Sequence, residues 1–572
     1  MKFITKNWSK NDDGILFFFQ RLEEMLYPLS DDIVRMPIHN TRTLMLEYMK
    51  NQNEMKNGKV MKYQIEQILQ ELTWSVQNDK ILVESFGETF VESVVNMIRK
   101  NESSSIHYLH NKIADKKYYE LSIEYLKKHV TQSSHKKEIE HGLRAWTVEM
   151  IQRGYSPTYM YEYLKDMMSN ENDPSICFDS FMQNFDLNEK EYRIYLLFDA
   201  SVHEYKALLA ARLNINFDDD GTFEQIKKRK NDFIGFVKIK SLDRYRAVEQ
   251  VYANVSIFIK YYRVISNRCT ELVRMKANIV NESTGDMFVI PVKPLGYRSV
   301  ELEPSINIQG AIDSIIIECQ SKTTKDYLNL SKMVDLHNDA IEQHDLKDGF
   351  LNLWSILEIV TSDIQKESKI EKIIEGVIPI LQKDYFSVLM ENIEQDLKDN
   401  LSRKDFDNLI HTISSKRNMR DVIAKFVFLP EFEKLREEYF LKLSAYPIIR
   451  NKIYILWELK DCKHNLLILA NNYSRRVKWH IYRLYRTRNA IVHSGTSHMR
   501  IQELGEHLHI YIDRILNEIL WKLSTEKTLR TISDVLMDTK LSLQKINECL
   551  EKKQPVLEND LPILHENFFY KS

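Results

Sequence analysis

The sequence predicts a mainly α-helical protein of several domains with one small α+β segment near its middle. Only 14 Gly and 12 Pro interrupt the 572 residues, and Leu, Ile, Lys and Glu are abundant, a composition that favours helices. Apolar residues recur at spacings of three and four in many segments, which indicates helices with one buried face. One stretch instead has alternating apolar residues, which predicts strands. At 43% hydrophobic residues, the chain is long enough for several cores.

We expect residues 1–184 to form a helical N-terminal domain with a sensory or regulatory role. Helical spacing is clear at 64–72, 90–98 and 118–130, and a polar break follows at 169–174. His107 and His110 are three residues apart, but no cysteine or third histidine joins them. They are interpreted as surface or packed histidines rather than metal ligands.

Residues 185–322 are predicted to form a small α+β domain. Strands are predicted at 192–198, 233–242, 272–280 and 287–292. Asp243 caps a predicted helix that reaches residue 265. The Gly-rich phosphate loops Gly-x-Gly-x-x-Gly and Gly-x-x-x-x-Gly-Lys are both absent, which argues against the common nucleotide-hydrolysing motors.

The rest of the chain is predicted to be all-α, as one helical domain at 323–525 followed by a C-terminal helix and tail at 526–572. Its main helices are expected at 327–343, 350–361, 474–495, 501–523 and 526–553. Gly495 is a natural C-terminal stop for the helix at 474–495.

That helix carries an unusual concentration of charge. No Asp or Glu occurs from Cys462 to Gln502, in a chain whose net charge is −2. The same segment holds eight cations: Lys463, Arg475, Arg476, Lys478, Arg483, Arg486, Arg488 and Arg500. Cations gathered without counter-charges repel one another, so we expect an anion from outside, and phosphate is the obvious candidate.

The end of the helix carries a more specific pattern. Arg488-Asn489-Ala490-Ile491-Val492-His493 has an Arg, then four residues, then a His, and Ser-Gly follows. The run at 485–495 resembles the signature end of the ApeA-like branch of the HEPN superfamily. Many members of that superfamily are metal-independent ribonucleases of bacterial antiphage defence and toxin–antitoxin systems. The resemblance implies an abortive-infection effector with Arg488, Asn489 and His493 at its catalytic site.

A second segment is also similar to this branch. Trp354 and Glu358 lie four apart on one face of the helix at 350–361. In related domains an acidic residue on this helix faces the Arg/His motif, so the resemblance implies that Glu358 holds Arg488 or orients His493. The alternative is an acid at the edge of an apolar helix, paired with any lysine. The resemblance covers about 323–525, which we therefore expect to be a HEPN-like helical domain.

The spacing alone does not single out one pair. Three other pairs also fit it: Arg475 with His480, Arg500 with His507, and Arg486 with His493. At about 100° per residue, Arg488 and His493 are roughly 140° apart around an ideal helix, whereas Arg486, Asn489 and His493 share one face. Either the helix loosens near His493 or Arg486 shares the site.

Other interpretations of these residues remain open. An Arg and a His in the last turns of a helix can simply satisfy its terminal carbonyls and dipole. The set Arg475, Arg476, Lys478, Arg483 and Arg486 is predicted to bind RNA, and such a surface can hold RNA without cutting it. A metallohydrolase built from His493, His498, His507 and His509 is disfavoured, because two histidines in a helical His-x-His point about 200° apart. No metal or cofactor is expected.

The mechanism follows from RNA, whose 2′-hydroxyl is an internal nucleophile. A His near neutral pKa serves as base or acid, and an Arg stabilises the charge on the scissile phosphate. One histidine per site is not well suited to carry out both proton transfers. Related domains bring two copies of the motif together, and this chain has one copy, so the resemblance implies a homodimer. The resemblance also makes a phage-derived trigger the expected partner. The rival hypothesis is a non-catalytic sensor that binds RNA or a nucleotide.

The sequence also predicts a cytoplasmic protein that does not enter membranes. Five scattered cysteines without Cys-x-x-Cys suggest reduced thiols. No apolar run approaches the length of a membrane span, and the N-terminus, with Asp12 and Asp13, lacks the pattern of a signal peptide.

Overall fold

The computed structural model describes the whole chain except residues 7, 36, 57–60, 101–102, 115–116, 171–172, 219–220, 228, 231, 267–270, 293–323, 343–344, 415–418, 497–499, 527 and 566–572. The described chain is mainly helical with one small antiparallel sheet, which confirms the predicted fold class at that level. The chain divides into two compact units. Unit 1 comprises Met1–Trp146 and Gly296–Ser572, and unit 2 comprises Thr147–Leu295.

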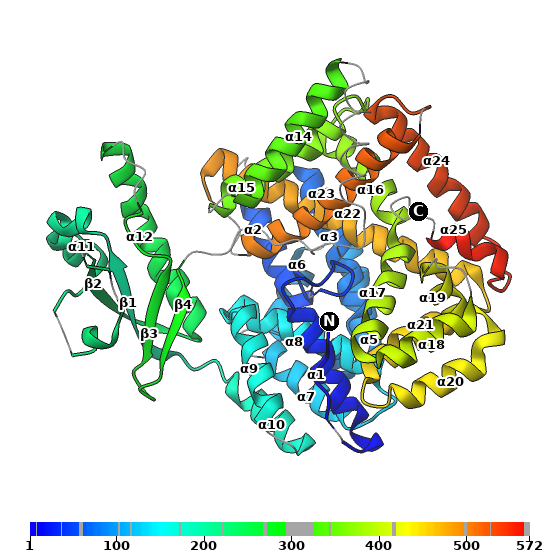
Figure 1. Ribbon diagram of the computed structural model, residues 1–572, viewed down its shortest axis with the longest axis horizontal. Coiled ribbons are helices and arrows are strands. Elements are labelled where there is room, and N and C mark those ends of the chain that lie inside the picture. The colour runs from blue at the N-terminus through cyan, green and yellow to red at the C-terminus, as the bar shows by residue number, and fades with distance from the viewer. Residues whose placement is uncertain are drawn as a thin grey trace. The chain divides into compact units, whose positions relative to one another are not determined.

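Unit 1 is built from helices at both ends of the chain (Figure 1). The N-terminal helices are α1 (Asp13–Leu26), α2 (Thr41–Lys56), α3 (Lys62–Asn78), α4 (Lys80–Phe86), α5 (Glu88–Arg99), α6 (Ser103–Lys112), α7 (Lys117–Val130) and α8 (Lys136–Arg153), of which α8 runs on into unit 2. The C-terminal helices are α14 (Thr324–Glu342), α15 (Leu346–Val360), α16 (Lys369–Lys383), α17 (Tyr385–Asn400), α18 (Arg403–Ile413), α19 (Met419–Phe428), α20 (Glu433–Lys442), α21 (Pro447–Trp457), α22 (Lys463–Ser494), α23 (Ile501–Thr525), α24 (Ile532–Leu550) and α25 (Leu561–His565).

Helix α22 is the longest of these and packs against helices from both ends of the chain. It contacts α15, α16 and α24 from the C-terminal part and α3 from the N-terminal part. Figure 1 shows it in orange beside the blue α3. The predicted apolar stripe of Val477, Ile481, Leu484 and Ile491 is buried, because it is the face that packs. Gly495 ends the helix in the left-handed conformation (φ 63°), and its N–H donates to the carbonyl of Ile491.

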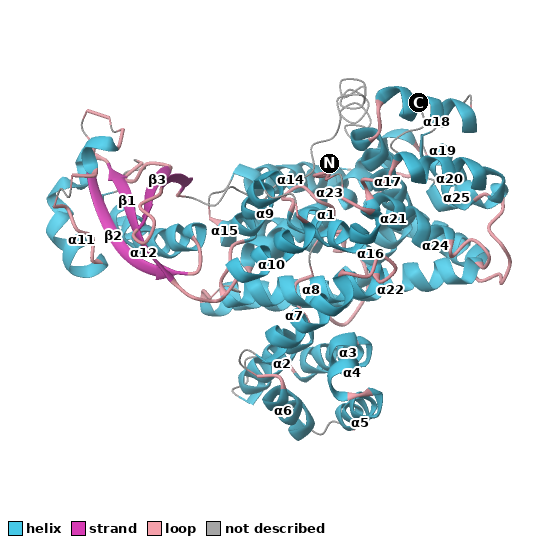
Figure 2. Ribbon diagram, turned by 90° about the horizontal axis from the view of Figure 1, so that it is seen from below, coloured by secondary structure: helices cyan, strands magenta, loops and turns pink. Residues whose placement is uncertain are grey.

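Unit 2 is an α+β unit whose strands are drawn in magenta in Figure 2. Its elements are α9 (Pro157–Asn170), α10 (Pro174–Asn184), β1 (Lys190–Phe198), α11 (Lys206–Leu213), β2 (Phe233–Ser241), α12 (Arg244–Ser266), β3 (Lys276–Asn281) and β4 (Met287–Pro291). The sheet order is β2-β1-β3-β4, and all of its pairs are antiparallel. Helix α12 covers one face of the sheet, where Val251 and Val255 pack in the same core as Ile194 and Ile279.

Asp243 begins α12 as predicted from its type and position. Its carboxylate accepts hydrogen bonds from the N–H groups of Tyr245 and Arg246, at 2.8 Å and 2.9 Å, which satisfies the free donors of the first turn. It also accepts from the N–H of Ser156, at 2.6 Å. Burial raises the pKa of Asp243 to about 6, although these backbone donors favour its ionised form.

Several element ends differ from those predicted. α22 begins at Lys463 rather than 474, and α15 begins at Leu346 rather than 350 because Asp345 caps it. β3 begins at Lys276 rather than 272. α25 was not predicted. Ends are set by caps and by tertiary contacts, which apolar periodicity does not encode.

The compact units do not follow the predicted domain limits at 184, 322 and 525. Residues 1–146, predicted as part of a separate domain, belong to the same unit as the C-terminal helices, and α9 and α10 belong to unit 2. Periodicity shows that a helix has a buried face but not which segment covers it, and this explains the difference. The end of the predicted α+β domain, 293–322, lies outside the described residues.

No helix in the described part of the chain has an apolar stretch that is long enough to cross a membrane. Cys177, Cys462 and Cys549 are free, while Cys269 and Cys319 lie outside the described residues.

Candidate functional site

Arg488 and Glu358, paired by the sequence argument, lie together in the structure. The Arg488 Nη2 atom of α22 is 3.5 Å from the Glu358 Oε1 atom of α15, and both side chains are about a quarter exposed (23% and 29%). The buried Trp354 donates its indole N–H to the same oxygen of Glu358, at 3.0 Å. Asn489 accepts a 3.3 Å hydrogen bond from Arg488 Nη1. Two neighbours thus orient the guanidinium while leaving it partly open to solvent.

Trp354, whose indole binds Glu358, also packs against helix α22. The ring of Tyr485 on α22 lies 5.8 Å from the ring of Trp354, at a tilt of 36°. Aromatic pairs at this separation add a favourable contact beyond simple burial. Trp354 therefore links α15 and α22 and fixes the carboxylate that faces Arg488.

His493 is exposed in the last turn of α22. A residue of α15 binds the chain just after this turn: the ammonium group of Lys347 donates a hydrogen bond to the carbonyl oxygen of Gly495, at 2.8 Å. The hydroxyl of Ser494 donates a hydrogen bond to the carbonyl oxygen of Ala490, at 2.7 Å. The helix end is thus ordered by these hydrogen bonds, while His493 remains exposed to solvent.

The helix does not loosen near His493, and Arg486 does not share the site. α22 stays helical through Ser494, so Arg488 and His493 are separated by roughly 140° around its axis. Arg486 instead donates to Glu47 of α2, at 2.7 Å, and its side chain is only 9% exposed. Neither of the two ways in which the sequence argument brought Arg and His together on one helix is therefore correct.

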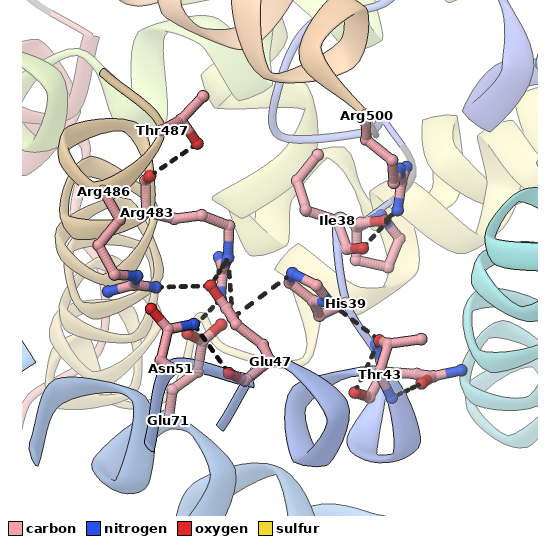
Figure 3. Close-up of polar contacts among 12 residues, drawn as sticks. Ile38, His39, Thr43, Glu47, Asn51, Glu71, Arg483, Arg486, Thr487 and Arg500 are labelled. Atoms are coloured by element: carbon pink, nitrogen blue, oxygen red, sulfur yellow. Dashed lines mark hydrogen bonds and ion pairs between the residues drawn. The ribbon is translucent and has the colours of Figure 1, made fainter. Parts of the chain in front are cut away.

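Glu47 also neutralises Arg483, with help from Glu71 of α3. Arg483 Nη2 lies 3.0 Å from Glu47 and 2.6 Å from Glu71, and its side chain is 4% exposed. His39 Nε2 lies 3.5 Å from Glu47 on its other side. Figure 3 shows this cluster, with Arg483 and Arg486 reaching down from α22 onto the acids of α2 and α3. The prediction that Arg483 and Arg486 await an external anion is wrong, because acids from the N-terminal helices serve as their counter-charges.

The pKa values of Glu47 and Glu71 are shifted in opposite directions by this environment. Burial raises the pKa of Glu47, but the charges of Arg483 and Arg486 outweigh it and hold this pKa well below its usual range. Burial raises the pKa of Glu71, and there the attraction of Arg483 does not compensate, partly because Glu47 adds a like charge. Glu47 is therefore the stable anion of the cluster.

Other cations of the segment are also paired, and three remain exposed. Lys463 lies 2.7 Å from Asp560, and buried Arg500 lies 3.6 Å from Glu503. Of the predicted RNA-binding set, Arg475, Arg476 and Lys478 are exposed on α22. The basic surface that a phosphate can reach is thus smaller than the count of cations suggested.

His480 and His507, the histidines of two alternative pairs, are buried. Their rings meet at 4.8 Å, and His480 Nδ1 lies 3.0 Å from the hydroxyl of Tyr511. Burial, reinforced by the charges of Arg483 and Arg500, lowers the pKa of His480 to about 3. His480 is thus neutral at pH 7 and enclosed by protein, which suits a packing role better than proton transfer.

A cavity of about 290 Å³ lies among these residues in unit 1. Trp74 and Trp479, whose rings are 5.7 Å apart, line it together with Arg144 and Arg476. His507 also lines it, and within the described residues neither ring nitrogen of His507 has a hydrogen-bond partner. A cavity lined by aromatic rings, arginines and buried nitrogens without hydrogen-bond partners is suited to bind a small ligand.

The histidines considered for a metal are not gathered into one group. His493 is exposed at the end of α22, His507 lines the cavity, and His498 lies outside the described residues. His509 lies 3.0 Å from His337 of α14.

Sequence reasoning missed the acids at Glu47 and Glu71. Nothing in α2 or α3 marks these two among the many acids of the chain, and they meet Arg483 across more than 400 positions. The Trp354–Glu358 spacing, by contrast, is a local signal that sequence reasoning used.

No family model, curated protein or solved structure matches this chain. The resemblance to HEPN proteins therefore rests on the residues quoted above.

Proposed function

We propose that the protein is a metal-independent endoribonuclease of HEPN type, with Arg488 and His493 as catalytic residues and Asn489 and Glu358 as positioning residues. The substrate is RNA, because only RNA supplies the 2′-hydroxyl that the mechanism requires. The expected setting is antiphage defence by abortive infection, as the resemblance implies.

In the proposed reaction the 2′-oxygen loses its proton and attacks the adjacent phosphorus. The bond from phosphorus to the 5′-oxygen breaks, and that oxygen takes up a proton, leaving a 2′,3′-cyclic phosphate and a 5′-hydroxyl. His493 acts as the base or the acid in these transfers. Arg488 stabilises the negative charge that develops on the phosphoryl oxygens.

The observation that carries the proposal is the setting of Arg488. A partly exposed ion pair at 3.5 Å is worth about 0–1 kcal/mol, so a phosphate can compete with Glu358 for the guanidinium. Glu358 is fixed by Trp354, which keeps Arg488 oriented when no RNA is bound. An arginine needed only for structure would be expected to have a closer and more buried partner, as Arg483 has.

Arg475, Arg476 and Lys478 are proposed to bind the RNA backbone near the site. They lie within one turn of α22 and are exposed. Their contribution is ionic and is expected to weaken as salt rises, independently of sequence. Arg483 and Arg486 are withdrawn from this role because of their ion pairs with Glu47.

The test is cleavage of RNA by purified full-length protein in EDTA. We expect cyclic-phosphate and 5′-hydroxyl ends from the wild type. His493→Ala and Arg488→Ala are each expected to lower the rate about a hundredfold to a thousandfold, the effect of about 3–4 kcal/mol of lost transition-state stabilisation. The ends are identified by their response to polynucleotide kinase and by mass spectrometry.

His411→Ala is the matched control, because His411 is also an exposed histidine in the last turn of a helix, α18. It should cleave at the wild-type rate. Cleavage that requires a divalent ion, or that survives in His493→Ala, contradicts the proposal.

A second candidate, a sensor that binds a nucleotide or RNA without cutting it, is favoured by the cavity beside α22. Trp74 and Trp479 offer faces for a planar base, and Arg144 and Arg476 offer charge for a phosphate. For such a protein His493→Ala would leave ligand binding unchanged, while Arg476→Ala would weaken it. Both functions can coexist if the ligand regulates cleavage.

A further inference from the structure

Three possible metal-ligand atoms from two helices converge on one point in unit 1. His337 lies on α14, and His509 and Asp513 lie four residues apart on one face of α23. His337 Nε2 is 2.7 Å from Asp513 Oδ1 and 3.0 Å from His509 Nε2. The remaining edge of the triangle, from His509 Nε2 to Asp513 Oδ1, is 3.4 Å.

These three separations match the edges of a metal coordination sphere. Ligand atoms bound about 2.0–2.1 Å from one ion are about 3.3–3.4 Å apart in a tetrahedron and about 2.8–3.0 Å apart in an octahedron. The 3.4 Å edge equals the tetrahedral value, the 3.0 Å edge equals the octahedral value, and the 2.7 Å edge is slightly shorter than either. Two imidazole nitrogens and one carboxylate oxygen are also a common set of ligands for a divalent transition metal.

Hydrogen bonds alone do not explain this triangle well. A neutral imidazole Nε2 carries either one proton or one lone pair, directed along a single line. His337 Nε2 can therefore form a hydrogen bond with Asp513 or with His509, but not with both. If each histidine donates to Asp513, two N–H groups face each other at 3.0 Å. A cation at the centre satisfies all three atoms at once.

We propose that His337, His509 and Asp513 bind one divalent transition-metal ion, with Zn²⁺ as the best match to this donor set. His509 is buried, while His337 and Asp513 have side chains that are 20% and 28% exposed, so an ion can enter from the solvent side. The ion would fasten α14 to α23. This role is separate from the proposed RNA cleavage, which needs no metal.

The experiment uses full-length protein stripped with a chelator and then titrated with ZnCl₂ against a chromogenic zinc indicator. We expect one tightly bound Zn²⁺ per chain and a higher thermal midpoint with zinc. CoCl₂ in place of zinc should produce visible absorption bands that report nitrogen and oxygen ligands around the ion. MgCl₂ should produce neither a thermal shift nor competition, because Mg²⁺ prefers oxygen ligands.

His509→Ala and Asp513→Asn should each lower zinc affinity at least about tenfold and remove the cobalt bands. Asp513→Asn changes little in size, and circular dichroism establishes that it is folded. His135→Ala is the matched control, since His135 Nδ1 faces His129 Nδ1 at 2.8 Å in another histidine pair. It should bind zinc as the wild type does.

Wild-type protein that takes up no zinc overturns the proposal. So does Asp513→Asn protein that binds zinc with unchanged affinity and an unchanged cobalt spectrum, because the bound metal would then lie elsewhere. Cleavage of RNA in EDTA is measured separately below the thermal midpoint, so that failure of the metal site and failure of the nuclease proposal remain distinct.

Discussion

Burial decides what each histidine near α22 is able to do. His493 is exposed at the end of α22. His480 is enclosed with His507 and Tyr511, and its pKa is lowered to about 3. Two histidines that fit the same spacing rule relative to an arginine therefore have different chemistry.

The lowered pKa of His480 predicts a pH dependence of stability. Its folded pKa is about 3 and its unfolded value about 6.5, so between these limits the unfolded chain binds a proton that the folded chain does not. Folding stability from this group is complete above pH 6.5 and falls by about 1.4 kcal/mol for each pH unit below it. His480→Gln should remove this slope.

The measurement is the urea midpoint of wild type and His480→Gln between pH 4.5 and 8. Comparing the two proteins cancels the contributions of buried carboxyl groups. The two stabilities should run parallel between pH 7 and 8 and diverge below pH 6.5, where the wild type loses more. Parallel curves down to pH 4.5 would show that His480 is protonated in the folded protein.

At the scale of elements, two N-terminal helices supply the acids that the basic helix α22 lacks. Glu47 from α2 and Glu71 from α3 close onto Arg483 and Arg486. The arginines are largely buried, so they depend on these partners. The contact joins helices that are far apart in the sequence, and it makes α22 part of a core built by both ends of the chain.

Glu47→Ala is predicted to destabilise unit 1 by about 3–5 kcal/mol, because it leaves two buried guanidinium groups short of a counter-charge. The folded pKa of Glu47 is held well below its usual range, so its contribution is complete at neutral pH and is lost only as pH falls below about 4.5. Urea unfolding followed by circular dichroism measures the loss.

Glu66→Ala on α3 is the matched control for this prediction. Glu66 is 56% exposed and lies 4.0 Å from Lys62, so its loss should cost less than about 0.5 kcal/mol. Equal effects of the two substitutions would mean that the Glu47 cluster is no stronger than a surface ion pair.

At the scale of the whole molecule, the regular helical end of α22 determines whether one chain can form a complete site with both Arg488 and His493. Arg488 and His493 are about 140° apart around α22, so the two side chains of one chain leave the helix in different directions and would not face the same phosphate. A second copy of the chain solves this problem, because the arginine of one protomer can face the histidine of its partner. The proposed nuclease is therefore expected to be a homodimer with two composite sites.

Complementation tests this arrangement. Arg488→Ala and His493→Ala chains with different tags are expressed together, and the mixed dimer is purified through both tags. One of its two composite sites keeps both residues, so we expect about half the wild-type rate, whereas each parent alone is almost inactive. Light scattering gives the mass of the complex.

An inactive mixed dimer would contradict sites that take arginine and histidine from different chains. A monomer that cleaves RNA at low concentration would contradict the dimer itself.

The sequence by itself determined the local structure and the position of the motif. Apolar spacing marked several of the helices, alternation marked the strands, and Gly495 marked the end of α22, because these features depend on residues within a few positions of one another. The pairing of Arg488 with Glu358 was also anticipated, although only through resemblance to known proteins.

Tertiary structure alone decided which charges are free and which histidines are exposed. Arg483 looks like a phosphate ligand in the sequence but is neutralised by Glu47, and His337 meets His509 and Asp513 only when α14 packs near α23. The reason is physical. Electrostatic and metal-ligand partners are selected by distance in space, and no local periodicity records which distant segment will cover a given face.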